Sequence, residues 1–244
     1  MNIKLALGIV VGAAAFVATA NTANARMTVL ELFTSQGCSS CPPADELLGE
    51  IAQDNEDILA LSMPVDYWDY LGWKDSLASP KHSARQRAYA EARGDMAVYT
   101  PQIVVNGERH VIGSDGAAVA KTVNALNTPP VDVAFTKTGS TLTVELPDLA
   151  TSDAGPLRVW VVGFSVEEPV SIGRGENAGR TVSYHNVVRK MVDLGAWDGT
   201  SKTLSVKSGD VMMAGNYDCA VIIQRDVEGG AGPIIGATRL ALAE

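Results

Sequence analysis

Cysteine and histidine are scarce in this sequence, and acidic side chains outnumber basic ones. Among 244 residues there are three cysteines and three histidines. Three cysteines are too few for a small disulfide-stapled protein, and one cysteine pair supplies only two of the four ligands of a zinc site. The 28 acidic residues exceed the 19 basic ones, and an acidic surface repels nucleic acid and anionic lipid headgroups. We therefore expect no nucleic-acid partner, no metal and no other cofactor.

Long apolar runs are also missing, apart from one at the N-terminus. Residues 5–20 form a 16-residue apolar run after Lys4, and Ala23-Asn24-Ala25 follows as the small-x-small pattern of a signal-peptidase site. Sixteen residues are short for a membrane-spanning helix, and no second candidate follows. We predict that residues 1–25 are a cleaved signal peptide. The mature chain is then periplasmic or secreted and is not inserted in a membrane.

Several catalytic patterns are absent as well. No Ser/His/Asp or paired-carboxylate arrangement stands out, and no internal repeat is present. The segment GRGENAGRT (173–181) resembles a phosphate-binding loop only superficially, because Arg174 stands where that motif needs glycine and Arg180 where it needs lysine. We expect this loop to make hydrogen bonds within the protein, with partner recognition as a second possibility.

The stretch LFTSQGCSSCPPADELL (32–48) carries the cysteine pair. Pro42 and Pro43 are tolerated only in the first turn of a helix, so they place a helix start next to Cys38 and Cys41. The unpaired N–H groups and the dipole at that helix end favour a thiolate at Cys38. Cys41 is close enough to attack a mixed disulfide formed at Cys38. In an oxidising compartment the resting form should be the disulfide.

Alternatives for the pair stay open. The cysteines could form a structural disulfide, although so short a loop stabilises little through chain entropy. They could also form a copper site together with His110, from a predicted hairpin. Ser39 and Ser40, between the two cysteines, are expected to cap the helix.

The periodicity of the chain changes near residue 127. Before it we expect strands at 27–33 and 57–65, a hairpin at 102–113 around Asn106-Gly107, and helices at 42–53, 79–94 and 114–126. After it we expect strands within 131–147 and at 157–166, 181–194, 201–208, 217–226 and 233–243. This order predicts an α/β thioredoxin-like (glutaredoxin-type) domain at 27–127, followed by an all-β sandwich-like domain at 130–244.

Three further residues are candidates for the site. In a thioredoxin-like fold a cis proline faces the cysteine pair, and Thr100 and Pro101 occupy the corresponding place before a strand, where they would position a substrate. An ordinary trans proline that bounds a strand is the alternative. Glu31 lies on the strand that leads to Cys38 and is a possible proton relay, with a solvated glutamate at least as plausible.

Several motifs together resemble a known family. The segments ELFTSQGCSSCPPAD, PVDYWDYLGWKD, RQRAYA, VYTPQIVVNG and GRGENAGRTVSYHNVV occur in this order. They resemble a family of secreted bacterial proteins of unknown function that has a thioredoxin-like fold. The resemblance implies that fold and no particular activity.

The combined interpretation is an exported thiol–disulfide oxidoreductase. Cys38 would attack protein or low-molecular-weight thiol and disulfide substrates, and Cys41 would resolve the mixed disulfide. The rival is a non-enzymatic metal-handling or partner-binding protein with a structural disulfide. The aromatic segment DYWDYLGW (66–73) is expected to pack within the protein, although it could also form a wall beside the cysteines. Cys219, in an alternating strand, is expected to be a buried free thiol.

Overall fold

The computed structural model describes residues 26–149, 155–213, 215–227 and 231–240. The predicted signal peptide at 1–25 lies outside these residues. The described part of the chain is mostly β, with 43% of its residues in strands and 21% in helices. Within the described ranges, no helix is long and apolar enough to cross a membrane.

The element order along the first half of the chain matches the sequence-based expectation. It is β1 (Thr28–Thr34), α1 (Pro42–Asp54), β2 (Ile58–Pro64), the short 3₁₀ helix η1 (Asp69–Leu71), α2 (Pro80–Arg93), β3 (Gln102–Val105), β4 (Arg109–Ile112) and α3 (Gly116–Ala125). The second half contains β5 (Ala134–Thr138), β6 (Thr141–Leu146), β7 (Leu157–Ser171), β8 (Thr181–Trp197), β9 (Lys202–Lys207), the one-turn helix α4 (Ser208–Val211), β10 (Tyr217–Arg225) and β11 (Ile234–Leu240).

Local signals explain where these elements begin and end. Ser79 caps α2 by accepting a hydrogen bond from the N–H of Lys81, and Asp115 caps α3 in the same way. The turn between β3 and β4 places both Asn106 and Gly107 at positive φ, 50° and 68°. Both residues of a type I′ hairpin turn need this conformation, which agrees with the predicted Asn-Gly turn.

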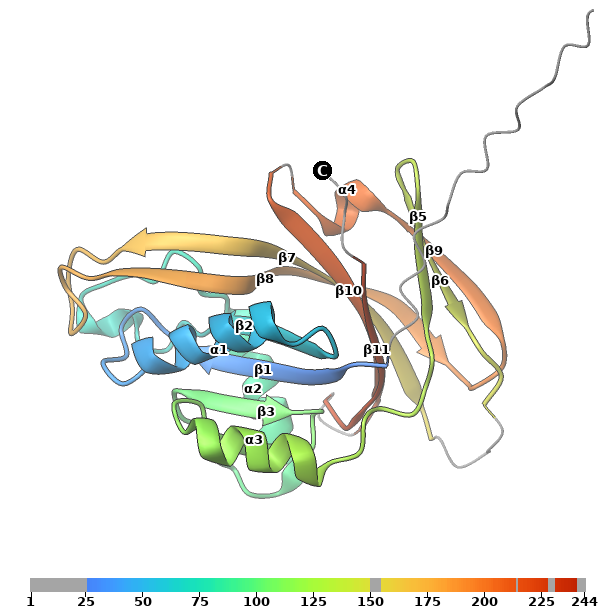
Figure 1. Cartoon of the computed structure of the whole chain (residues 1–244), viewed down its shortest axis with the longest axis horizontal. Helices are drawn as coiled ribbons and strands as arrows, with labels where there is room; N and C mark the ends of the chain where they lie inside the picture. The colour runs from blue at the N-terminus through green and yellow to red at the C-terminus, as the bar shows by residue number, and fades with distance from the viewer. Residues whose placement is uncertain (1–25, 150–154, 214, 228–230, 241–244) are drawn as a thin grey trace, which may run out of the picture.

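The predicted fold class, a thioredoxin-like α/β domain followed by an all-β sandwich, is wrong. Strands from both halves form one mixed eight-stranded sheet with the order β11-β10-β7-β8-β2-β1-β3-β4. The two halves join where β8 runs parallel to β2, with Ser62 opposite Val187. The second half adds a three-stranded sheet, β5-β6-β9, beside the large one (Figure 1). Periodicity reports which segments are strands, but it carries no information on which distant strands pair. The domain boundary near residues 127–130 stays a prediction.

The β7–β8 hairpin is longer than predicted and connects the two parts of the molecule. Its strands have 15 and 17 residues and pair from Leu157–Trp197 to Ser171–Thr181. Figure 1 shows the hairpin running along α1, so that its tip lies at the same end of the molecule as the start of that helix. The loop at the tip, residues 172–180, therefore lies above the CxxC segment.

The helices of the first half cover both faces of the sheet. Leu30 and Leu32 of β1 pack in a cluster with Ala44 and Leu48 of α1, which α3 also joins. Val29 and Phe33 of β1, on the other face, share a second cluster with Tyr89 of α2. The CxxC segment connects the end of β1 at Thr34 to the start of α1 at Pro42. It therefore lies at the N-terminal end of α1.

The second half has its own apolar core. Phe135, Leu142 and Val144 from the small sheet pack against Val221 and Ile223 of β10. Cys219 belongs to this core and is a free, buried cysteine, as predicted. Burial raises the pKa of the Cys219 thiol to about 12. This thiol is therefore unreactive at neutral pH and belongs to a different core from the cysteine pair.

Candidate functional site

Cys38 and Cys41 form a disulfide at the junction of β1 and α1. Backbone hydrogen bonds shape the loop that holds them: Cys38 N–H donates to Ser35 O at 3.1 Å, and Cys41 N–H donates to Cys38 O at 3.2 Å. The Cα atoms of the two cysteines are 5.4 Å apart. The chain thus brings the pair into disulfide geometry through one tight turn.

The start of α1 agrees with the sequence-based prediction in its prolines but not in its cap. Pro42 and Pro43 occupy the first helical positions. The N-cap residue is Cys41, whose side chain accepts no hydrogen bond from the first turn. Ser39 and Ser40 are exposed and precede the helix. The predicted serine cap is wrong, because Pro42 at the first helical position makes Cys41, the residue before it, the N-cap.

Both cysteines are buried beneath the β7–β8 loop. Cys38 is 2% exposed and Cys41 is fully buried. The side-chain amide of Asn177 donates to the backbone oxygen of Cys38 at 2.8 Å and to that of Gln36 at 3.0 Å. The loop GRGENAGRT therefore bonds to the CxxC segment, which agrees with the expected internal role.

Two tryptophans of the aromatic segment 66–73 also reach the CxxC segment. Trp73 donates its indole N–H to the side-chain oxygen of Gln36 at 2.8 Å. Trp68 lies against the cysteine loop, since a Cβ placed on Gly37 would be 3.1 Å from Cβ of Trp68. The segment packs within the protein, as expected. Tyr70, stacked on Trp68, is 77% exposed.

Thr100 and Pro101 lie beside this same loop. The indole N–H of Trp68 donates to the hydroxyl of Thr100 at 2.8 Å. A Cβ placed on Gly113 would be 3.2 Å from Cβ of Pro101 and 3.3 Å from Cβ of Ala44, in the first turn of α1. The Thr100–Pro101 peptide bond is cis. The structure thus brings both predicted positioning residues to the disulfide end of α1.

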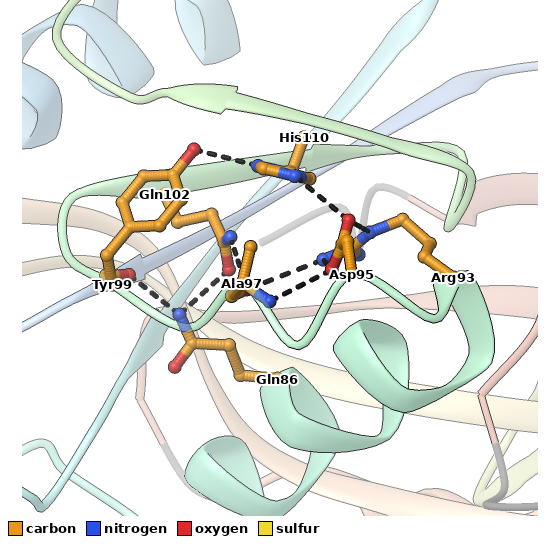
Figure 2. Close-up of polar contacts among 7 residues, drawn as sticks. All are labelled: Gln86, Arg93, Asp95, Ala97, Tyr99, Gln102 and His110. Atoms are coloured by element: carbon orange, nitrogen blue, oxygen red, sulfur yellow. Dashed lines mark hydrogen bonds and ion pairs between the residues drawn. The ribbon is translucent and has the colours of Figure 1, made fainter.

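The segment that leads to Thr100 is fixed by a polar cluster around His110 (Figure 2). The Nδ1 atom of His110 is 2.8 Å from the hydroxyl of Tyr99, and its Nε2 atom is 3.1 Å from the carboxylate of Asp95. Arg93 also donates to Asp95, at 2.8 Å, and this bond is the main cause that lowers the pKa of Asp95 to about 2. Both nitrogens of His110 are therefore engaged in holding the segment between α2 and β3.

A pair of glutamines supports the same segment from below (Figure 2). The side-chain amide of Gln86 donates to the backbone oxygen of Tyr99 at 2.7 Å and to the side chain of Gln102 at 2.9 Å. Gln102 in turn donates to the backbone oxygen of Ala97 at 3.0 Å. The position of Thr100 and Pro101 is thereby set by side chains from α2 and β3 rather than by the loop alone.

Glu31 is buried in an ion pair on the opposite face of β1 from α1. Its carboxylate accepts from Arg85 at 2.6 and 3.2 Å and from the hydroxyl of Tyr89. Burial alone would lower the pKa of Arg85, but the Glu31 charge raises it above its ordinary value. Glu31 thus contacts α2, whereas the cysteines border α1.

Asp45 is the acid that the structure places next to the cysteines, and sequence reasoning missed it. It lies one helical turn after Cys41, on the same side of α1. Asp45 is 2% exposed, and among the described residues Thr34 is the side chain whose hydrogen bonding favours its charged form. Burial, with a smaller contribution from the charge of Asp75, raises the pKa of Asp45 well above its ordinary value, and Thr34 offsets part of this shift.

No sequence signal distinguishes Asp45 from an ordinary acid. An aspartate in the first turn of a helix is common, because it interacts favourably with the helix dipole in solvent. Asp75 likewise is buried, and its carboxylate accepts from the backbone N–H of Gln36 at 2.8 Å. Burial raises the pKa of Asp75 as well. The two buried acids flank the CxxC segment from α1 and from the loop that precedes α2.

Comparisons with known proteins identify a family and two structural relatives. The family model described as a protein of unknown function (DUF1223) matches residues 29–224. Protein AGR_C_4864 from Agrobacterium tumefaciens is 34% identical, with a TM-score of 0.76 over 88% of this chain and 94% of that chain. HBP35 of Porphyromonas gingivalis is 16% identical, with a TM-score of 0.62 over 90% of this chain and 76% of that chain, which indicates a similar fold only.

A search of the curated proteins gives no match. The family match spans four fifths of the sequence and contains the CxxC segment, Thr100-Pro101 and the β7–β8 loop. The sequence-based resemblance to a family of unknown function is confirmed, without its thioredoxin-like fold. The chain belongs to the DUF1223 family of proteins of unknown function.

Proposed function

We propose that this protein is an exported thiol–disulfide oxidoreductase that uses Cys38 and Cys41. The disulfide between these residues at the start of α1 carries the proposal. A helix N-terminus stabilises a thiolate, which is the form of cysteine that attacks and leaves in disulfide exchange. Thr100 and Pro101, next to the same helix turn, would position the substrate.

The exchange proceeds in two steps. A client thiolate attacks Sγ of Cys38, the Cys38–Cys41 bond breaks, and Cys41 leaves as a thiolate. A second client thiolate then attacks the client sulfur of the mixed disulfide and releases Cys38 as a thiolate. The client loses two electrons and gains a disulfide, and the cysteine pair is reduced. Run in reverse, the same steps reduce a client disulfide.

Asp45 would manage the proton at Cys41. A thiolate that leaves inside the protein has to be neutralised, because an unpaired buried charge is unfavourable. Because its pKa is raised, Asp45 holds its proton to a higher pH than an exposed aspartate does. On reduction it would pass its proton to Cys41 and take up another from solvent, and on oxidation it would accept the proton of Cys41 and release one to solvent. This assigns to Asp45 the relay role that the sequence suggested for Glu31.

The test is turnover by defined variants. The rate at which wild-type protein oxidises a reduced, unfolded client, or reduces a model disulfide, is compared with the rates of Cys38→Ser and Cys219→Ala. Cys38→Ser should lose activity, whereas Cys219→Ala should keep it, because Cys219 is remote in the second core. Cys41→Ser should accumulate mixed disulfides with the client. Equal turnover by wild type and Cys38→Ser would reject the proposal.

A structural disulfide is the second candidate, and the burial of both cysteines favours it. In that case the bond should resist millimolar dithiols in the folded protein, and its loss should lower stability without affecting any client. The copper alternative has no comparable support. Both nitrogens of His110 already have hydrogen-bond partners, and the described residues contain no group of three or more metal-binding side chains.

A further inference from the structure

Both cysteines of the disulfide are buried, although the two residues between them are exposed to solvent. Ser39 and Ser40 are exposed, while Cys38 is 2% and Cys41 0% exposed. The segment above them is the tip of the β7–β8 hairpin, which is separated from Cys38 by 139 residues at Asn177. A thiolate has to approach the sulfur it attacks directly. Because Cys38 is almost fully buried, exchange at its sulfur requires neighbouring segments, this loop among them, to move.

The loop at the hairpin tip is closed at its base, and one side chain near its centre is buried. Ile172 N–H donates to Arg180 O at 2.9 Å, and Gly179 N–H donates to Ile172 O at 2.8 Å. Between these two residues Asn177 alone is buried, at 1% exposure, and the others are exposed. Gly175 and Gly179 have positive φ, 78° and 82°. The loop thus has the form of a flap with a fixed base and one buried side chain.

The attachment itself is a pair of hydrogen bonds from one group. The Asn177 amide nitrogen uses both of its hydrogens on the carbonyl oxygens of Gln36 and Cys38, at 3.0 and 2.8 Å. Its side-chain oxygen is buried and has no hydrogen-bond partner among the residues that the structure describes. A second, apolar contact lies at the edge of the loop, where a Cβ placed on Gly173 would be 3.2 Å from the Trp73 ring. The unsatisfied oxygen lowers the net stability of the closed form, because it would regain a water partner on opening.

We propose that residues 173–179 are a lid over the disulfide and that Asn177 is the latch that holds it closed. This inference rests on the proposed function for its purpose, since a lid matters only if the disulfide reacts. It adds that the resting protein is autoinhibited and that reaction follows opening. On opening, the carbonyls of Gln36 and Cys38 lose the hydrogen bonds from Asn177, and water or an N–H group of the client takes the place of the Asn177 amide.

Reduction of the disulfide by a small phosphine tests the lid without any client. Two ordinary hydrogen bonds shift an open–closed equilibrium by roughly tenfold to a hundredfold. Asn177→Ala should therefore speed reduction by about that factor at constant pH and phosphine concentration, measured by quenching with an alkylating agent and mass spectrometry. Glu176→Gln, an exposed neighbour in the same loop, should remain within about twofold of wild type. Equal rates for wild type and Asn177→Ala would overturn the lid.

Hydrogen exchange of the wild-type protein gives a second test that does not depend on a variant folding. If the loop opens locally, the side-chain amide hydrogens of Asn177, which bond to Gln36 O and Cys38 O, should exchange faster than those of Asn186, which is buried and donates to Ala60 O at 2.9 Å within the sheet. Exchange at Asn177 as slow as at Asn186 would show that the loop opens only on unfolding and would also overturn the lid.

The two proposals fail in different ways. If Asn177→Ala is reduced faster but neither it nor the wild type turns over any client, the lid stands and the oxidoreductase function fails. If the wild type turns over clients and its reduction rate equals that of Asn177→Ala, the function stands and the lid fails.

Discussion

Replacing Arg85 should destabilise this protein more than replacing any exposed arginine, because it leaves the buried carboxylate of Glu31 without its ion-pair partner. The side chains of Arg85 and Glu31 are 8% and 1% exposed and are joined by a salt bridge of 2.6 Å. Arg85 also donates to the hydroxyl of Tyr89 at 2.6 Å and to Gln224 of β10 at 3.1 Å. The network thereby connects β1, α2 and β10, which come from both halves of the chain.

The expected magnitude follows from the burial of the pair. Removing one partner of a buried ion pair costs about 3–5 kcal/mol, because the other charge is left without compensation. For a protein of this size each kcal/mol lowers Tm by about 2–4 °C. Arg85→Met should therefore lower Tm by about 6–20 °C. Adding Glu31→Gln to Arg85→Met should restore about half of the loss or more, because the neutral amide carries no buried charge.

The assay is urea unfolding followed by circular dichroism, with Arg87→Met as the matched control. Arg87 lies on the exposed side of the same helix, so its replacement should change the free energy of unfolding by less than about 0.5 kcal/mol. If Arg85→Met and Arg87→Met unfold alike, Glu31 does not depend on Arg85, and the reasoning fails. The single variant Glu31→Gln also separates the two roles suggested for this acid. An ion-pair role predicts lower stability with unchanged turnover per folded molecule, and a relay predicts the reverse.

Three further predictions concern the surroundings of the disulfide and the pH dependence of stability. Because the pKa of Asp45 is raised in the fold, the wild type loses stability as pH rises above about 4, and Asp45→Asn should gain stability relative to it over the same range. Urea unfolding between pH 4 and 8 checks this. The exposed control Glu50→Gln should show no such trend. His82, whose pKa burial lowers to about 4, stays neutral in the fold. The wild type should therefore lose stability as pH falls from 6.5 toward 4, and His82→Gln should lack this part of the Tm profile. Trp68→Phe keeps an aromatic ring but removes the N–H bonded to Thr100, so it should lower the free energy of unfolding in urea by about 1 kcal/mol.

The local structure of the chain could be predicted from its sequence because the signals that set it are local. Pro42-Pro43, Ser79, Asp115 and Asn106-Gly107 each fix an element boundary through contacts within a few residues. The cysteine pair follows the same logic, since one turn of backbone is enough to bring its sulfurs together. The cis bond before Pro101 was inferred from a resemblance and is present in the structure.

The assembly of these elements could not be predicted, because its determinants are separated by more than 100 residues. The join between the halves depends on β8 lying beside β2, where the amide of Asn186 donates to Ala60 O at 2.9 Å. Asn186 itself has a positive φ of 48°, and the periodicity of apolar residues in the sequence does not predict this conformation. The register of β7 and β8 also shifts at Val159/Trp160 and at Gly163/Phe164. Such shifts bend a hairpin and increase its twist within the eight-stranded sheet.

The chemistry of the site and the access to it are therefore encoded in different parts of the chain. The segment from β1 to α1 determines that two sulfurs meet at a helix N-terminus. In the proposed function, the access of a client to these sulfurs would depend on Trp68 and Trp73, from the segment before α2, and on Asn177, from the tip of the β7–β8 hairpin, because these side chains contact the surroundings of the cysteine pair. A change at Asn177 should consequently alter the rate of exchange at Cys38 without altering the chemistry of the cysteine pair. A CxxC motif considered alone would indicate an exposed pair of cysteines, whereas the complete fold buries both of them.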